Sequence, residues 1–162
     1  MPRRLYFVRH GLADRAAFSG DDDRRRPLTD GGREQLRRQG EVMAGLDLGV
    51  ELILSSPLLR AEQTAAILAE ALAPAGGLVL DPRLGLSFGT GALARMLREH
   101  GEAQRLLLVG HEPSFSEVVG EITGGSQVTC RKGSLIRVDL HGEGPPRGSL
   151  EWSIPARVLL AL

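Results

Sequence analysis

The chain has 162 residues, of which 42% are hydrophobic and 25% charged, and its formal net charge is zero. This balance argues against a general affinity for nucleic acid, which requires a basic surface, and no apolar run approaches the ~20 residues of a membrane span. One cysteine, Cys130, excludes an internal disulfide, and no signal-peptide pattern is present. We therefore expect a soluble, cytoplasmic protein with a single domain over residues 1–162.

Short apolar runs alternate with longer segments of helical character along the chain. Strands are predicted at residues 5–8, 52–54, 78–80 and 106–109, and helices at residues 30–46, 58–72, 92–99 and 113–122. Thr29 or Asp30 can cap the first helix, and Pro113 suits the first turn of the last. The tail predicts two more strands, 134–140 and 149–154, paired as a hairpin at the sheet edge. This order predicts an α/β fold, a three-layer sandwich with a mostly parallel central sheet flanked by helices.

Polar residues follow three of these strands at the point where each strand ends. They are Arg9-His10-Gly11, then Ser55-Ser56-Pro57 leading into a helix with Arg60 in its first turn, and Gly110-His111-Glu112-Pro113. Ligands bind at the carboxyl ends of parallel strands, so the three ends are expected to form one pocket. That pocket faces the amino terminus of the helix near Pro113, where free backbone N–H groups, including that of Glu112, attract anions. The ligand implied is a phosphoryl group.

Three blocks of sequence, in this order, resemble the histidine phosphatase superfamily, whose fold is phosphoglycerate mutase-like. The blocks are Leu-Tyr-Phe-Val-Arg-His-Gly at 5–11, Ser-Ser-Pro-Leu-Leu-Arg-Ala-Glu-Gln-Thr at 55–64 and Val-Gly-His-Glu-Pro at 109–113. Arg-Pro-Leu-Thr-Asp-x-Gly at 26–32 also fits the entry to the family's first helix. In its short length and in the residue pattern of the second block, the chain is most similar to the SixA-type phosphohistidine phosphatases.

The resemblance implies a hydrolase that removes phosphate from phosphohistidine on a protein, in signal transduction. His10 would be the nucleophile and become phosphohistidine itself, Arg9 and Arg60 would bind the phosphoryl oxygens, and His111 would donate to another oxygen when protonated. No metal and no cofactor are needed for this chemistry. The implied partner is a phosphorylated protein of the histidine-phosphotransfer type, or a small phosphate ester. A small-molecule phosphomonoesterase and a non-catalytic phosphate-binding adaptor are the alternative functions.

The acidic residue that protonates the leaving oxygen in many family members is missing from its usual place. SixA-like chains often read Pro-Glu-Leu there, whereas this chain has Arg83 at the glutamate position and Asp81 two residues earlier. Glu112 and Asp14 are the candidate substitutes. A phosphoramidate has a labile P–N bond, so losing the acid is more tolerable for phosphohistidine than for alkyl phosphates. The short chain also leaves little room for a lid, which favours a protein substrate.

Other reactive or charged residues have structural interpretations. Ser55 and Ser56 are expected to be turn and capping residues, and we expect no catalytic role for Cys130, His100 or His141. A run of charges covers residues 21–26, within a segment from 18 to 26. It is either a solvated loop or a rim that recognises a partner.

Overall fold

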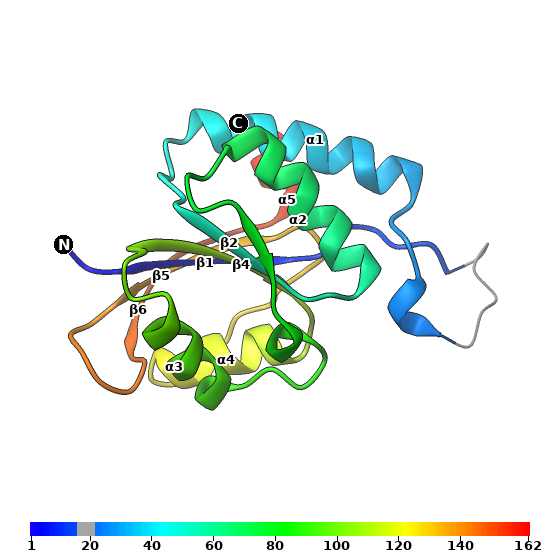
Figure 1. The fold of residues 1–162 in the computed structure, drawn as a ribbon. Coiled ribbons are helices and arrows are strands. Elements are labelled where there is room, and N and C mark those ends of the chain that lie inside the picture. The colour runs from blue at the N-terminus through cyan, green and yellow to red at the C-terminus, as the bar shows by residue number, and fades with distance from the viewer. Residues whose placement is uncertain (16–21) are drawn as a thin grey trace.

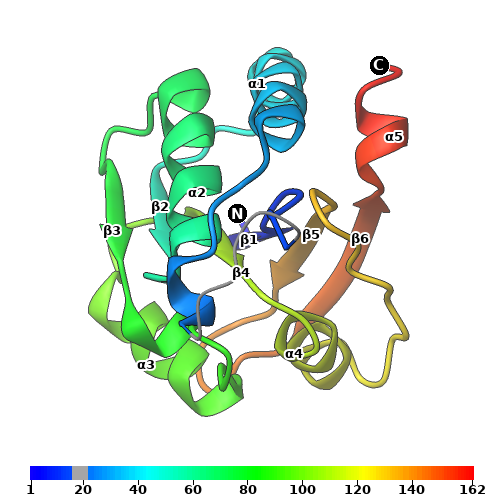
Figure 2. The same cartoon turned by 90° about the vertical axis from the view of Figure 1, so that its right-hand side faces the viewer.

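A sheet of six strands in the order β3-β2-β4-β1-β5-β6 forms the centre of the molecule, and helices cover both of its faces (Figures 1 and 2). The structure is a computed structural model and describes residues 1–15 and 22–162. The strands are β1 (Arg4–Arg9), β2 (Leu52–Ser55), β3 (Leu78–Leu80), β4 (Arg105–Gly110), β5 (Leu135–Leu140) and β6 (Gly148–Ile154). The helices are α1 (Asp30–Gly45), α2 (Leu59–Leu72), α3 (Thr90–Glu99), α4 (Ser114–Ile122) and α5 (Ala156–Leu159), with short 3-10 helices η1 (Asp23–Arg25) and η2 (Pro82–Leu84).

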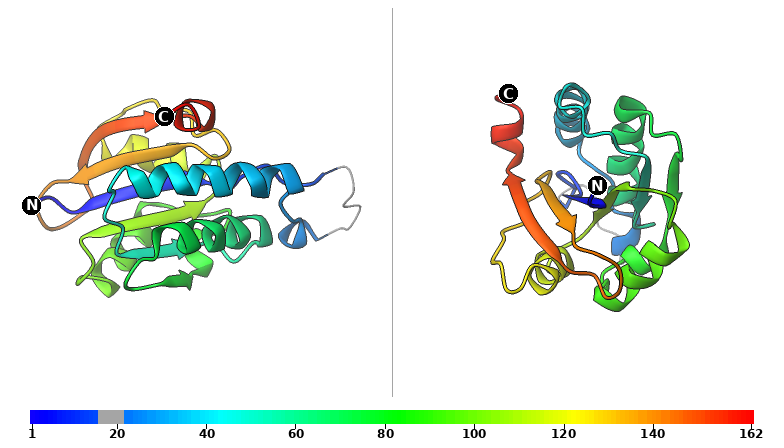
Figure 3. Two further views of the ribbon diagram at one scale, coloured as in Figure 1. Left: turned by 90° about the horizontal axis from the view of Figure 1, so that it is seen from above. Right: turned by 90° about the vertical axis from the view of Figure 1, so that its left-hand side faces the viewer.

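The sheet is mostly parallel, as predicted. Strands β3, β2, β4 and β1 pair in parallel, whereas β5 runs antiparallel to β1, and β6 antiparallel to β5. The last two strands therefore form the expected hairpin at the sheet edge, as the view from above shows (Figure 3). The carboxyl ends of β1, β2 and β4 point to the same side of the molecule, away from the N-terminus in Figure 1.

Side chains of the central strands alternate between two hydrophobic cores, one on each face of the sheet. Leu5 and Phe7 belong to the core beneath α3 and α4, and the Phe7 ring meets that of Phe115 edge-on at 5.2 Å. Tyr6 and Val8 belong to the opposite core, which is covered by α1, α2 and α5 (Figure 2). Burial on both faces explains why these strands read as continuous apolar runs. It also makes the strands a rigid base for the loops at their ends.

The helix boundaries follow local hydrogen bonding. Thr29 caps α1 as predicted, because its hydroxyl accepts a hydrogen bond from the Gly32 N–H at 2.9 Å. The last large helix begins at Ser114, so Pro113 is the preceding cap residue and not part of the first turn. Helix α3 begins at Thr90, two residues before the predicted start. The three shortest helices were not predicted, since three or four residues carry no periodic pattern.

Candidate active site

Two histidines from separate strand ends lie side by side in the structure. His10 follows β1 and His111 follows β4, and their ring centroids are 5.3 Å apart. The two side chains are buried, as is Arg60 in the first turn of α2. The backbone N–H of His10 donates to the carbonyl of Gly110 at 3.1 Å, which ties the two strand ends together. The structure therefore brings the ends of β1 and β4 together, with His10 and His111 adjacent.

His10 is held as a neutral imidazole with one free nitrogen. Its Nδ1 lies 2.8 Å from the carbonyl oxygen of Gly11. A carbonyl only accepts, so Nδ1 carries the hydrogen and Nε2 keeps its lone pair. Burial lowers the pKa of His10 to about 3, and the charges of His111, Arg60 and Arg9 act in the same direction, opposed by the bond to Gly11. A neutral ring with an unprotonated Nε2 is the form that can attack phosphorus.

His111 is oriented by Ser56, which the sequence predicts to be a turn or capping residue. Nε2 of His111 lies 2.8 Å from Oγ of Ser56, which also accepts a hydrogen bond from the Leu58 N–H at 3.1 Å. With Leu58 occupying an acceptor position, the Ser56 hydroxyl can donate to Nε2, and Nδ1 then carries the hydrogen. Burial, followed by the charge of Arg60, lowers the pKa of His111 to about 4, whereas Asp23 raises it. His111 is thus neutral in the empty pocket, but its Nδ1–H is still a donor.

Arg9 and Arg60 each keep a donor unused inside the pocket. Arg9 donates from Nη1 to the carbonyl of Cys130 at 3.3 Å. Arg60 donates from Nη1 and Nη2 to the backbone oxygen and the Oδ2 atom of Asp23, at 2.8 and 2.9 Å. In both arginines Nε is buried without a hydrogen-bond partner. Burial lowers the pKa of Arg60, and Asp23 opposes this shift.

Arg26 also lies at the candidate site, although the sequence predicts it only as part of the segment that leads into α1. Its side chain is largely buried, and its Nε donates to Oδ1 of Asp23 at 3.1 Å. Its Nη1 atom is buried without a partner. The one signal in the sequence was an arginine directly before Pro27, a position that neither a strand end nor a helical period distinguishes. Its placement comes from the tertiary packing of η1 against α2.

Unpartnered buried donors converge on this pocket. Of the described residues, the atoms in this condition are Arg9 Nε, Arg26 Nη1, Arg60 Nε, His111 Nδ1 and, at the start of β4, Arg105 Nε. A buried donor left without an acceptor costs roughly 1–3 kcal/mol, so such groups are rare in folded proteins. Four of these five atoms belong to His111 or to arginines whose charges act on it, and a ligand rich in acceptor oxygens can satisfy such donors. The arrangement is suited to a phosphoryl group.

The second sequence block also supplies the residues that hold the loops in place. The Thr64 hydroxyl accepts from the Gly11 N–H at 3.1 Å and donates to the Arg60 carbonyl at 2.7 Å. The side-chain oxygen of Gln63 accepts from the Leu28 N–H at 2.9 Å. Thr64 therefore fixes the turn after His10, and Gln63 fixes the segment that follows Arg26.

The acidic residues named as proton donors have other bonds. Both carboxylate oxygens of Glu112 accept from Ser116, one from its N–H at 2.8 Å and one from its hydroxyl at 2.7 Å. Asp14 follows Ala13, which pairs with Leu28, and the backbone N–H of Asp14 donates to the carbonyl of Pro27. Glu112 thus caps the start of α4, and the first-turn N–H of Ser116 is already paired. Among the described residues, the Glu112 carboxylate hydrogen-bonds to Ser116 and to neither histidine.

Arg83, at the position of the usual acid, is held by two carboxylates. Its guanidinium bonds to Asp81 and to Glu99, with closest contacts of 2.6 Å each. These contacts lower the pKa of Asp81, mainly through the bond from Arg83, and raise that of Arg83. Asp81 is therefore an ionised partner of Arg83 and cannot serve as a proton donor at neutral pH.

Part of the charged run at residues 21–26 lies at the surface, and part contacts the candidate active site. Residues 16–21, including Asp21, lie outside the described part of the chain. Asp22 and Arg24 pair with each other on the surface, whereas Asp23 and Arg26 turn toward Arg60. The prediction of a solvated loop thus holds for part of the run only.

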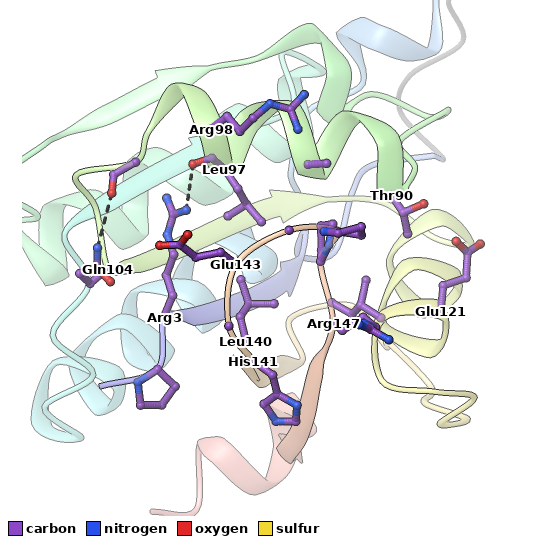
Figure 4. Close-up of a pocket in the computed structure, with 18 of the residues that line it drawn as sticks. Arg3, Thr90, Leu97, Arg98, Gln104, Glu121, Leu140, His141, Glu143 and Arg147 are labelled. Atoms are coloured by element: carbon purple, nitrogen blue, oxygen red, sulfur yellow. Dashed lines mark hydrogen bonds between the residues drawn. The ribbon is translucent and has the colours of Figure 1, made fainter.

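A hollow of about 990 Å³ lies at the end of the sheet where β1 and β4 begin, and Figure 4 shows residues that line it. It is bounded by the N-terminal residues, by α3, and by the loop between β5 and β6 that carries His141. Arg3 reaches the backbone of Leu97 there, and none of the predicted site residues lines it. His141 lines this hollow, and Arg3 also donates to the backbone carbonyl of His100.

The described residues contain neither a metal-binding cluster nor a membrane-spanning helix. Within residues 1–15 and 22–162, no three His, Cys, Asp or Glu side chains gather in an arrangement that could hold a metal ion. In the same part of the chain, no helix is both long enough and apolar enough to cross a bilayer.

Comparison with known proteins agrees with the sequence resemblance. A family model for the histidine phosphatase superfamily (branch 1) matches residues 5–85. The phosphohistidine phosphatase SixA of Escherichia coli is 32% identical over 155 residues, which cover 93% of this chain and 92% of that protein. An uncharacterized protein of Picosynechococcus is 42% identical over 139 residues, 82% of each chain.

Solved structures extend the likeness to the fold. The protein histidine phosphatase SixA in complex with tungstate superposes with a TM-score of 0.83 at 25% identity, covering 95% of this chain and 97% of that one. A mycobacterial glucosyl-3-phosphoglycerate phosphatase shares the fold, with a TM-score of 0.74 at 18% identity over 93% and 98% of the two chains. These findings support a phosphatase. The chain belongs to the histidine phosphatase superfamily and is similar to its SixA-type members.

Proposed function

We propose that this protein hydrolyses phosphohistidine on a protein substrate through a phosphohistidine intermediate on His10. One observation carries the proposal: the neutral His10, with Nε2 unprotonated, shares a buried pocket with unpartnered donors of Arg9, Arg26, Arg60 and His111. A nucleophile beside a ready set of oxyanion donors is the requirement of phosphoryl transfer. The relative from Escherichia coli is named a phosphohistidine phosphatase, which supports the same activity.

In the first step, Nε2 of His10 attacks phosphorus as the P–N bond of the substrate breaks. The electron pair of that bond goes to the substrate imidazole, which takes a proton from solvent. In the second step, water attacks the phosphorus of phospho-His10, inorganic phosphate leaves, and the electron pair of the P–N bond returns to Nε2. The Nδ1–H bond to Gly11 holds the ring orientation throughout.

The surrounding cations stabilise the charge on the transferring group. Arg9, Arg26 and Arg60 supply guanidinium donors, whose planar geometry matches phosphoryl oxygens. His111 supplies its Nδ1–H, and an incoming dianion raises the pKa of His111 from its low value in the empty pocket. Positioning and electrostatic stabilisation are then the main sources of rate enhancement.

The leaving group decides between the proposed substrate and the alternative. Arg83 stands where SixA-like chains often carry glutamate, and Glu112 is engaged by Ser116. An alkoxide leaving group gains about 10²–10⁴-fold from a placed acid, whereas an imidazole leaving group depends on it less. The alternative, a small-molecule phosphomonoesterase, is favoured by the fold shared with the glucosyl-3-phosphoglycerate phosphatase.

The test offers the protein a phosphohistidine phosphotransfer protein and a panel of alkyl phosphates in parallel. We expect turnover of the phosphohistidine protein to exceed that of every ester, and quenching with base should trap an acid-labile phosphoenzyme. His10→Ala should lose both signals, and His141→Ala, which alters an exposed histidine at the other end of the sheet, should keep them. Equal turnover of the esters would favour the small-molecule enzyme. Absence of a phosphoenzyme in the active wild type would refute the mechanism. A wild type that hydrolyses none of these substrates would instead indicate the non-catalytic phosphate-binding adaptor.

A further inference from the structure

Asp23 makes an unusual set of contacts between two arginines of the pocket. Its backbone oxygen and Oδ2 accept from Nη1 and Nη2 of Arg60, and its Oδ1 accepts from Nε of Arg26. The side chains of Arg60 and Arg26 are 4% and 10% exposed, whereas that of Asp23 is 54% exposed. A surface carboxylate therefore reaches inward and engages two buried cations.

The contacts determine which donors of the two arginines remain available. With both terminal nitrogens of Arg60 on Asp23, its Nε is buried and unpartnered, and the same is true of Nη1 of Arg26. A guanidinium is planar and rigid, so fixing one edge fixes the direction of the other N–H bonds. Asp23 thus sets the orientation of both groups before a ligand arrives.

Asp23 also offsets the repulsion between cations in the empty pocket. Arg26 and Arg60 repel each other, as the effect of Arg26 on the pKa of Arg60 shows, and Asp23 acts in the opposite direction. Lys132 faces the same charges, because its pKa is lowered by burial and then by Arg9, Arg15, Arg26 and Arg60. Without a counter-charge, guanidinium groups this close would separate. A carboxylate between them holds the two guanidinium groups in place.

We propose that Asp23 is a positioning residue, which holds Arg60 and Arg26 in the orientation that grips the phosphoryl group. The inference rests on the proposed phosphatase function and adds a residue that the sequence analysis placed in a charged loop. Asp23 does not contact the phosphoryl group in this proposal, and it stays on the two arginines while the ligand occupies their free donors. A competing arrangement, in which phosphate displaces Asp23 from Arg60, predicts the opposite effect of its removal.

The test measures binding of inorganic phosphate by calorimetry, together with kcat and KM for a phosphohistidine protein. Asp23→Ala should weaken phosphate binding by about tenfold or more, the size expected for losing charge-assisted hydrogen bonds. Asp23→Asn should be intermediate, since its amide oxygen still accepts one bond. Asp22→Ala is the matched control: it removes the same charge from the residue that caps the same short helix, and among the described residues the Asp22 carboxylate bonds to the exposed Arg24. A thermal melt of each variant checks the fold.

The outcomes separate this inference from the function on which it rests. Weaker phosphate binding and a lower kcat/KM in Asp23→Ala, with Asp22→Ala unchanged, would support it. Binding that is unchanged or tighter in Asp23→Ala would overturn it, tighter binding meaning that the carboxylate competes with phosphate. An equal loss in Asp22→Ala would assign the effect to general charge or to folding of the helix, and would overturn it as well. A wild type that binds no phosphate would refute the proposed function itself, and this inference with it.

Discussion

The Ser56 hydroxyl lies 2.8 Å from Nε2 of His111 and links the end of β2 to the end of β4. The same oxygen accepts the Leu58 N–H, and its own hydrogen can be donated to the imidazole when Nδ1 of His111 carries the ring hydrogen. This pair determines which nitrogen of His111 carries the hydrogen and therefore which atom can donate to a ligand. A residue that the sequence marked as a turn former thus controls the state of a pocket histidine.

Ser56→Ala should lower kcat/KM on the order of tenfold, because His111 loses the bond that selects its Nδ1–H form. Ser55→Ala is the matched control, since Ser55 is equally buried and, within the described part of the chain, its hydroxyl donates to the carbonyl of Ser56 and not to a histidine. Steady-state kinetics of both variants, beside their melting temperatures, would check this. Equal losses of activity in the two would contradict it.

Thr64→Val should destabilise the protein by about 1–3 kcal/mol, because the Gly11 N–H loses its acceptor in a buried place. Valine keeps the volume, so the change isolates the hydroxyl. Thr64→Ser keeps the hydroxyl and should retain most of the activity, whereas the valine variant should lose activity as the turn after His10 loosens. Denaturant unfolding and kinetics measure the two effects. A valine variant as stable and active as the wild type would show that the hydroxyl bond is dispensable.

Stability should fall as pH is lowered from 7 to 5, because His10 and His111 are neutral in the folded state. Their pKa values of about 3 and about 4 lie below the unfolded value near 6.5. Between pH 6.5 and 4 the unfolded chain therefore binds more protons than the folded chain does. Lowering the pH then stabilises the unfolded state relative to the folded state. By this linkage each histidine accounts for about 2 kcal/mol between pH 7 and 5.

The measurement is the free energy of unfolding at pH 7 and at pH 5 in His10→Gln, His111→Gln and wild type. Each variant should lose less stability over this interval than the wild type, and the exposed His141→Gln should behave as the wild type does. Carboxylates with lowered pKa values, such as Asp81, become protonated below pH 4. They therefore do not contribute to the change in unfolding free energy between pH 7 and 5. A variant with an unchanged pH dependence would show that its histidine is not buried in the neutral form.

The Cys130 thiol should not react with a thiol reagent in the native protein at pH 8. It is 1% exposed, and burial raises its pKa to about 12, so neither access nor thiolate is available. In guanidinium chloride the reagent should titrate one thiol per chain, since the sequence has one cysteine. Rapid labelling of the native protein would indicate that the loop beside Arg9 opens.

Much of the fold could be predicted from the sequence. Continuous apolar runs such as residues 5–8 and 106–109 indicate central strands, because side chains buried on both faces must all be apolar. The pairing of Arg9-His10 with the other strand ends then follows from parallel topology. The cap at Thr29 could be predicted as well, since it depends only on neighbours in sequence.

Contacts between residues distant in sequence could not be predicted in this way. The bonds of Asp23 to Arg60 and of Ser56 to His111 join segments that the chain brings together only by folding, and the burial of Arg26 likewise depends on the folded chain. A hydrogen bond depends on a few tenths of an ångström and on direction, and neither residue type nor spacing encodes these quantities. Residue types and their positions at strand ends predict which side chains take part in phosphoryl transfer. The tertiary structure decided their charge states, their hydrogen positions and which donors stay free, because burial and neighbouring charges set all three.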